Sequence, residues 1–126
     1  MAIDPGSKKC GLAVVNNEAQ VLKKMVISIE LLNETVTALE REYSLSMILV
    51  GDRTNSRYIG ECLTQFKLPI IAVDEDKSSI EGRYRYLKEN TRCLAKLIPI
   101  GLRIPKCPYD DYVAVVLAER YLKKRF

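Results

Sequence analysis

The fold is decided by residues 2–15, which read AIDPGSKKCGLAVV. A short apolar run ends at the acidic Asp4, a Pro-Gly-Ser sequence turns the backbone, and Gly11 opens a second apolar run that we interpret as a returning strand. This pattern places Asp4 at a strand tip. Turn amides can face a phosphate while the carboxylate holds a magnesium ion, so the turn is a candidate site for metal and phosphate together. The alternative is an ordinary hairpin in which Asp4 only caps the turn.

The residue types narrow the chemistry that the chain can perform. The sequence contains no His, and its Cys residues at positions 10, 62, 93 and 107 include no CxxC pair. A structural zinc site and His-dependent catalysis therefore have little support. Carboxylates that act together with a metal ion become the leading option.

Size and hydropathy favour one domain. The chain has 126 residues, of which 48% are apolar, so we expect residues 1–126 to form a single domain with one core. No apolar run approaches the roughly 20 residues that span a bilayer, and the N-terminus lacks the basic-then-apolar layout of a signal peptide. We therefore expect a cytoplasmic location and no membrane partner.

Charge is unevenly distributed along the chain. Residues 1–76 hold 8 Lys and Arg against 11 Asp and Glu, whereas residues 77–126 hold 12 against 5. The basic second half is suited to attract a polyanion, and the acidic first half carries most of the candidate metal ligands. Charge thus favours a nucleic-acid partner, although many basic surfaces are only solvated faces.

Strand and helix patterns alternate after the opening turn. Apolar runs with a period of two, or continuous ones, predict strands, and a period of 3.6 residues predicts helices. The expected elements are strands at Cys10–Val15 and Val21–Ile29, a helix at Glu30–Tyr43, a strand at Ser46–Gly51, a helix capped by Asn55 or Ser56, a strand at Leu68–Val73, a helix from Ser78, an irregular segment at 91–108 and a helix from Asp110. This order predicts an α/β fold in which three antiparallel and two parallel strands form a mixed sheet flanked by helices.

Acidic residues recur where two later elements begin or end. Asp74, Glu75 and Asp76 follow the strand at Leu68–Val73, where open α/β sheets place their sites, although a solvated acidic loop is the alternative. The last helix starts with two acids, which ordinarily complement the helix dipole.

Helical geometry separates the two acids at this helix start by about 100°. Asp110 shares a face with Val113 and Leu117, so we expect it to lean toward the sheet and the first strand's tip. We expect Asp111 to project sideways as a solvated charge.

The helix from Ser78 is expected to bury one stripe and expose another. Ser78 and Glu81 form a capping-box pattern. The buried stripe is predicted to contain Ile80, Tyr84 and Leu87, and the exposed bases are Arg83, Arg85 and Lys88.

Four motifs together resemble a known family. Its D-x-G-x-x-x-x-G-x-A is similar to Asp4–Ala13, its V-V-G to Leu49–Gly51, its D-E-R-L-[ST]-[ST] to Asp74–Ser79 and its closing D-x-x-A-A helix to Asp110–Leu122. Each motif is weak alone, but four in the right order and spacing are specific. Over nearly its whole length the chain resembles the YqgF/RuvX family, which has a ribonuclease H-like fold and is described as Holliday junction resolvases or pre-16S ribosomal RNA nucleases.

The resemblance implies a metal-dependent phosphodiester hydrolase whose catalytic and metal-binding residues are Asp4, Glu75 and Asp110. Asp4 would bridge two magnesium ions roughly 3.5–4 Å apart, one activating water and the other stabilising the leaving oxygen, and manganese is a substitute. The residues expected to contact phosphate or nucleic acid are Gly6, Ser7, Lys8, Lys9, Ser78, Ser79, Arg83, Arg85 and Lys88.

The chain departs from the family pattern at three places. Asp76 stands where the family has Arg, and the family's L-P-x-N-x-D-G loop is shortened here to Asp52–Ser56. Substrate contacts by these two loops are expected to differ. Three residues precede Asp4, whereas a strand usually has about 5–6 residues, so we expect a clipped first strand.

Several functions compete. We favour processing of the 5′ end of pre-16S ribosomal RNA. The alternatives are a Holliday junction resolvase acting on branched DNA and a non-catalytic ribosome assembly factor that binds nucleic acid. The chain is expected to be a monomer or a homodimer, since a resolvase would dimerise. An actin-like or sugar kinase is ranked last, because such proteins close two related domains on a nucleotide.

Overall fold

The computed structural model describes residues 1–52, 56–74, 78–90 and 110–125. In chain order its elements are β1 (Ala2–Pro5), β2 (Lys9–Val15), β3 (Val21–Ser28), the 3₁₀ turn η1 (Ile29–Leu31), α1 (Leu32–Glu42), β4 (Ile48–Gly51), α2 (Ser56–Cys62), the 3₁₀ turn η2 (Leu63–Gln65), β5 (Ile70–Val73), α3 (Ser78–Asn90) and α4 (Asp110–Arg125).

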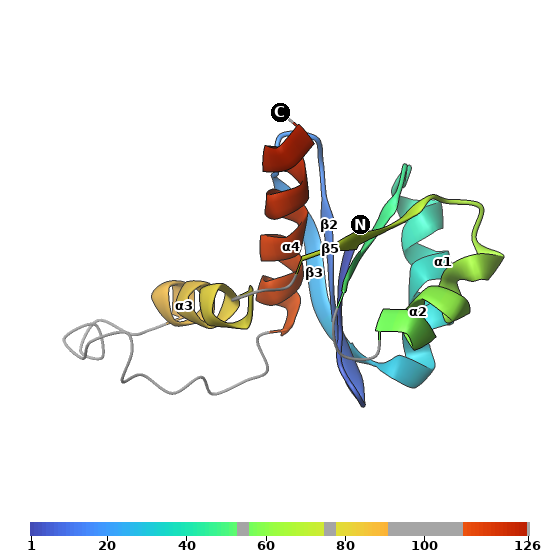
Figure 1. The fold of residues 1–126 in the computed structure, drawn as a ribbon, viewed down its shortest axis with the longest axis horizontal. Helices are drawn as coiled ribbons and strands as arrows, with labels where there is room; N and C mark the ends of the chain where they lie inside the picture. Colours follow the sequence, from blue (N-terminus) through green and yellow to red (C-terminus); the bar gives the residue numbers. More distant parts are fainter. Residues whose placement is uncertain (53–55, 75–77, 91–109, 126) are drawn as a thin grey trace.

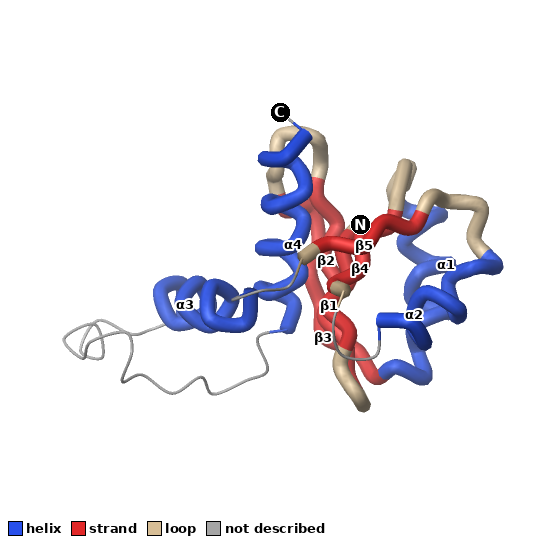
Figure 2. The backbone as a smooth tube through the Cα atoms, viewed as in Figure 1, coloured by secondary structure: helices blue, strands red, loops and turns tan. Residues whose placement is uncertain are grey.

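The strands form one five-stranded mixed sheet with the order β3-β2-β1-β4-β5 (Figure 2). β2 is antiparallel to both β1 and β3, whereas β4 is parallel to β1 and β5 is parallel to β4. The expected α/β fold with a mixed sheet is confirmed, and the central strand β1 has only four residues. Because β1, β4 and β5 run in one direction, their C-terminal ends meet at the same edge of the sheet.

Helices cover both faces of the sheet (Figure 1). α1 and α2 lie on one face, α4 lies on the other, and α3 packs outside α4. Successive side chains of β1 alternate between these faces. Ile3 belongs to the core under α1 and α2, whereas Ala2 belongs to the core under α4. Asp4, two residues after Ala2, therefore lies on the α4 face.

α4 is the most buried helix of the part of the chain that the structure describes. Its residues from Tyr112 to Ala118 are all buried. A helix that is apolar all round needs neighbours on every side, and α4 has the sheet on one side and α3 on the other (Figure 1). No helix within the described ranges combines the length and the hydropathy needed to cross a membrane.

The predicted buried stripe of α3 is wrong. Ile80 and Tyr84 are 69% and 49% exposed, and of the predicted stripe only Leu87 is buried. The periodicity of the large apolar residues therefore points to the wrong face of this helix.

A glycine and a tyrosine make the contact of α3 with α4 instead. A Cβ on Gly82 would lie 2.5 Å from Cγ2 of Val113, so the two helices approach closely where Gly82 lacks a side chain. Beside this contact Tyr86 packs edge-on against Tyr112, with 5.6 Å between the ring centroids. The small residue sets the contact face, and a search for bulky apolar residues overlooks it.

The first turn of α4 lies directly on β2 at a second glycine. A Cβ on Gly11 would lie 1.9 Å from the carbonyl oxygen of Asp110 and 2.7 Å from the amide nitrogen of Asp111. Gly11 is also the register partner of Asp4 in the β1–β2 pair. We call the meeting of Asp4, Gly11 and Asp110 the Gly11 junction. It brings the start of α4 next to the acidic residue of the central strand.

Gly11→Ala should destabilise the protein by about 3 kcal/mol or more, because the added methyl group meets backbone atoms that no rotamer change can move. Gly60→Ala is the matched control, because nothing lies within 4 Å of a Cβ at Gly60. Because Gly60 lies within α2, this control should raise the free energy of unfolding by up to about 1 kcal/mol through helix propensity. Urea unfolding measures both free energies, and equal stability of the two variants would contradict the close packing.

Candidate functional site

The candidate site is built on the Gly11 junction. Asp4 is half-buried near the end of β1 on the α4 face, and Asp110 is half-buried at the start of α4. The backbone of Asp110 rests on Gly11, the register partner of Asp4. The expectation that Asp110 leans toward the sheet agrees with this position. Two acids that are 106 residues apart in sequence are thus held near each other by a backbone contact.

The pKa values at the junction reflect this concentration of negative charge. Burial, together with the charges of Asp4 and Asp110, raises the pKa of Cys10 to about 11. The same thiol therefore experiences the fields of both carboxylates. Burial also raises the pKa of Asp110 above its ordinary value of 3.8, the charge of Asp111 adds to this, and Lys9 acts in the opposite direction. Crowded, partly desolvated carboxylates favour the approach of a cation.

Asp111 has a different environment from the one expected. Its side chain is only 14% exposed and forms an ion pair with Lys24, whose Nζ lies 3.7 Å from Oδ2 of Asp111. The same Nζ lies 4.1 Å from the centroid of the Tyr112 ring. The expectation of a freely solvated charge is therefore wrong, because β3 carries Lys24 up to the first turn of α4. Asp111 fastens the helix to an edge strand.

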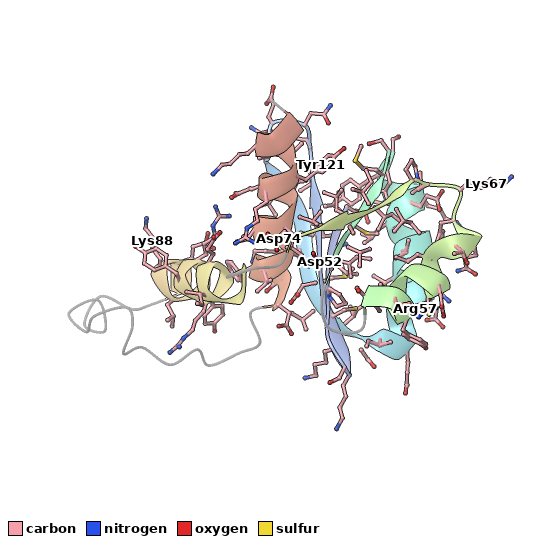
Figure 3. The ribbon with its side chains drawn as sticks, viewed as in Figure 1. Asp52, Arg57, Lys67, Asp74, Lys88 and Tyr121 are labelled. Atoms are coloured by element: carbon pink, nitrogen blue, oxygen red, sulfur yellow. The ribbon has the colours of Figure 1, made fainter. Side chains whose placement is uncertain are left out.

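The third expected acid, Glu75, lies outside the described residues, as does Asp76. Asp52 and Asp74 are exposed directly after β4 and β5 (Figure 3), and these two strands end at the same edge of the sheet as β1. Asp52 was not among the predicted site residues, although its position directly after a parallel strand is a usable signal. Within the described ranges no group of three His, Cys, Asp or Glu side chains is arranged to hold a metal ion.

The expected phosphate contacts in the β1–β2 turn are available to a ligand. Ser7, Lys8 and Lys9 are exposed. A Cβ on Gly6 would lie 2.4 Å from the carbonyl oxygen of Lys9, so glycine permits the tightness of the turn. This turn presents two ammonium groups within a few residues of Asp4.

The basic residues of α3 that were expected to contact nucleic acid have different environments. Lys88 is exposed and points away from the sheet (Figure 3). Arg85 instead forms an ion pair with Glu119 of α4, so its guanidinium is engaged within the fold. Arg83 is only half exposed, and it also has an interaction within the fold. The helix starts at Ser78, but the side chains of Ser78 and Ser79 lie outside the description.

Arg120 of α4 adds a second polar link between the same elements. Its guanidinium donates to the carboxylate of Glu81 at 2.8 Å and to the carbonyl oxygen of Asp74 at 3.0 Å. α4 is thereby connected both to α3 and to the end of β5. These arginine contacts could not be read from the sequence, because the spacing along α3 does not show which side faces α4.

Comparisons with known proteins assign the chain to no family. No family model and no curated protein matches it. Among solved structures it is similar to a ROK family glucokinase from Streptomyces griseus in complex with glucose and AMPPNP, with 14% identity and a TM-score of 0.45. The match covers 66% of this chain and 35% of the glucokinase chain, so this chain spans about a third of that protein. A likeness of this size carries no argument about function.

Asp110→Asn should increase stability at neutral pH in the presence of a chelator. The folded-state pKa of Asp110 is raised, so the stability contributed by its protonated form is present below pH 3.8 and is lost as the pH rises through the folded value. The variant has no charge at this position, so it avoids this loss. Its free energy of unfolding should exceed that of the wild type by less than about 1 kcal/mol, because solvent partly screens the group. The difference from wild type should disappear below pH 3.8.

Asp111→Asn is the matched control at the adjacent position. It removes the ion pair with Lys24 and should lower the free energy of unfolding by about 1 kcal/mol. Denaturant titrations across the pH range measure both variants. A loss of stability in Asp110→Asn with a gain in Asp111→Asn would show that the two environments are assigned to the wrong residues.

Proposed function

We propose that this chain is a metal-dependent nuclease with a ribonuclease H-like fold that hydrolyses phosphodiester bonds of nucleic acid, with pre-16S ribosomal RNA as the favoured substrate. The Gly11 junction is the observation that carries the proposal, because it brings the acid of the central strand next to the acid that starts the last helix. The order of strands and helices that underlies the resemblance to the YqgF/RuvX family is also the order of elements in the fold. This agreement supports the proposal.

Asp4 and Asp110 have the donor chemistry that magnesium prefers, namely hard carboxylate oxygens. The raised pKa of Asp110 reflects burial and the charge of Asp111, and a bound cation would offset both. The proposed third ligand, Glu75, lies outside the described residues. When bound, magnesium would activate a water molecule and stabilise the leaving oxygen.

The chain's own residues would position the substrate around these acids. The exposed ammonium groups of Lys8 and Lys9 would bind a backbone phosphate beside Asp4. Lys9 also counters the negative charge at Asp110, as the pKa of that carboxyl shows. The tight turn at Gly6 keeps both lysines close to the end of β1. The polar links of Arg120 to Glu81 and to the backbone of Asp74 would hold α4 against α3 and the end of β5.

A non-catalytic assembly factor is the second candidate. The basic excess of residues 77–126 supports nucleic-acid binding equally well with or without turnover. A resolvase acting as a homodimer on branched DNA is a further form of the nuclease proposal, and it differs in substrate and oligomeric state rather than in the site. One set of cleavage assays distinguishes these candidates.

Purified protein should cleave precursor 16S ribosomal RNA in magnesium or manganese and not in chelator. A four-way DNA junction under the same conditions tests the resolvase alternative. Asp110→Asn should lower the cleavage rate at least about 100-fold, because it removes a charged ligand of the proposed metal. Asp111→Asn should keep most of the activity, since its carboxylate is occupied by Lys24.

Gel analysis of end-labelled substrates measures the cleavage, and a gel-shift assay measures binding in the same samples. Binding of precursor RNA without cleavage at any metal concentration would favour the assembly factor. Full activity of Asp110→Asn together with an inactive Asp4→Asn would remove α4 from the proposed site.

A further inference from the structure

A hollow of about 650 Å³ lies beside the β1–β2 turn, on the side of the sheet that carries α1 and α2. We call it the hairpin hollow. It is lined by Ser7, Lys8, Ser28, Ile29, Glu30 and Tyr58. Its volume is within the range of about 300–1,000 Å³ that is typical of small-molecule sites. The lining combines an ammonium group, two hydroxyl groups, a carboxylate and an aromatic ring.

The hollow has walls that are fixed to one another. The amide of Ile29 donates to the carbonyl oxygen of Lys8 at 3.0 Å, so the turn is tied to the start of η1. Ser7 and Lys8 on the turn and Ser28 at the end of β3 are exposed. Three polar groups suited to a phosphate are therefore held on adjoining segments.

Tyr58 supplies an aromatic wall from α2. Tyr58 is 51% exposed, whereas its neighbour Ile59 on the same helix is buried. Cys62, one turn further along α2, raises the Tyr58 pKa, and the charge of Glu30 raises it further. An exposed tyrosine ring on a helix is a suitable platform on which a base can stack.

Glu30 places a constraint on the ligand. A carboxylate repels a phosphate but accepts hydrogen bonds from an exocyclic amino group of a base. Glu30 and Tyr58 line the hollow together with Lys8, so a nucleotide can place its base against Tyr58 and Glu30 and its phosphate against Lys8. The lining is thus matched to a ligand with one anionic end and one aromatic, amino-bearing end.

We propose that the hairpin hollow binds one unpaired nucleotide, with its base stacked on Tyr58 and its phosphate on Lys8, Ser7 and Ser28. The assignment of this nucleotide to a strand that continues around the β1–β2 turn to the Gly11 junction, on the opposite face of the sheet, rests on the proposed function. Stacking on a side chain requires an unpaired base, so the substrate is single-stranded at this point.

Binding of a labelled single-stranded oligoadenylate, measured by fluorescence anisotropy in chelator, tests the proposal without any need for cleavage. Tyr58→Ala should weaken binding about tenfold, which is the scale of one lost stacking contact. Tyr58→Phe keeps the ring and should bind like wild type. Lys8→Ala should weaken binding and reduce the salt dependence by about one phosphate contact.

Matched controls use residues of the same type away from the hollow. Tyr84 is similarly exposed on α3, and Lys67 is exposed and points away from the body of the protein (Figure 3). Tyr84→Ala and Lys67→Ala should leave binding unchanged. Thermal melting of each variant shows whether it is folded. Equal effects of Tyr58→Ala and Tyr84→Ala, or no effect of Tyr58→Ala in a folded protein, would overturn the proposal.

Two further probes identify the source of the nucleotide. Competition by adenosine monophosphate that Tyr58→Ala abolishes would show that a free nucleotide suffices, and its absence would assign the hollow to a strand. A duplex that binds as tightly as the single strand, with the same dependence on Tyr58, would overturn the proposal. If the oligonucleotide binds as expected but no substrate is cleaved, the nucleotide site in the hairpin hollow is supported and the proposed nuclease activity is wrong.

Discussion

The candidate site depends on a contact between two backbones, namely the first turn of α4 and strand β2 at Gly11. Small residues surround this contact. Among the described residues, half of the buried side chains in the core under α4 are alanines, with Ala2 and Ala13 on the sheet and Ala114 and Ala118 on the helix. The opposite core contains larger residues, among them isoleucines and leucines of the sheet and helices. The difference in side-chain size lets α4 approach the sheet closely, and close approach is what brings Asp110 near Asp4.

The close approach of α4 to the sheet has an electrostatic cost, which neighbouring residues offset in part. Asp110 is partly buried beside Asp111, and both effects raise its pKa. Lys24 pairs with Asp111, and Lys9 acts favourably on Asp110. Crowded carboxylates are common at functional sites, where local stability is given up for ligand binding. The Gly11 junction has this character.

The sheet and most element positions could be predicted from the sequence, because strand and helix periods are strong in the first half of the chain. The placement of Asp110 beside the sheet also followed from its spacing to Leu117, which packs in the core under α4, whereas Val113 of the same expected face contacts Gly82 of α3. α3 was assigned the wrong face, because Gly82 rather than Ile80 or Tyr84 makes its contact. Helical spacing shows that a face exists, but it does not show how a partner helix will meet it.

Ion-pair partners on distant elements could not be predicted either, because helical spacing does not show which elements meet. The ion pairs Lys24–Asp111 and Arg85–Glu119 join residues far apart in sequence, and a single sequence contains no signal of such pairing. Asp111 and Arg85 were therefore both expected to be solvated. Ser7, Lys8 and Lys9 remain exposed in the turn that follows β1.

The central claim is that Asp4 and Asp110 form one cation site across Gly11. Paramagnetic manganese titrated into the isotope-labelled protein tests it directly, because manganese broadens the NMR signals of nuclei close to it. The account predicts that the amide signals of Asp4, Gly11 and Asp110 broaden first, at concentrations that leave the amides of α1 unchanged. Uniform broadening, or broadening that begins away from these three residues, would contradict it.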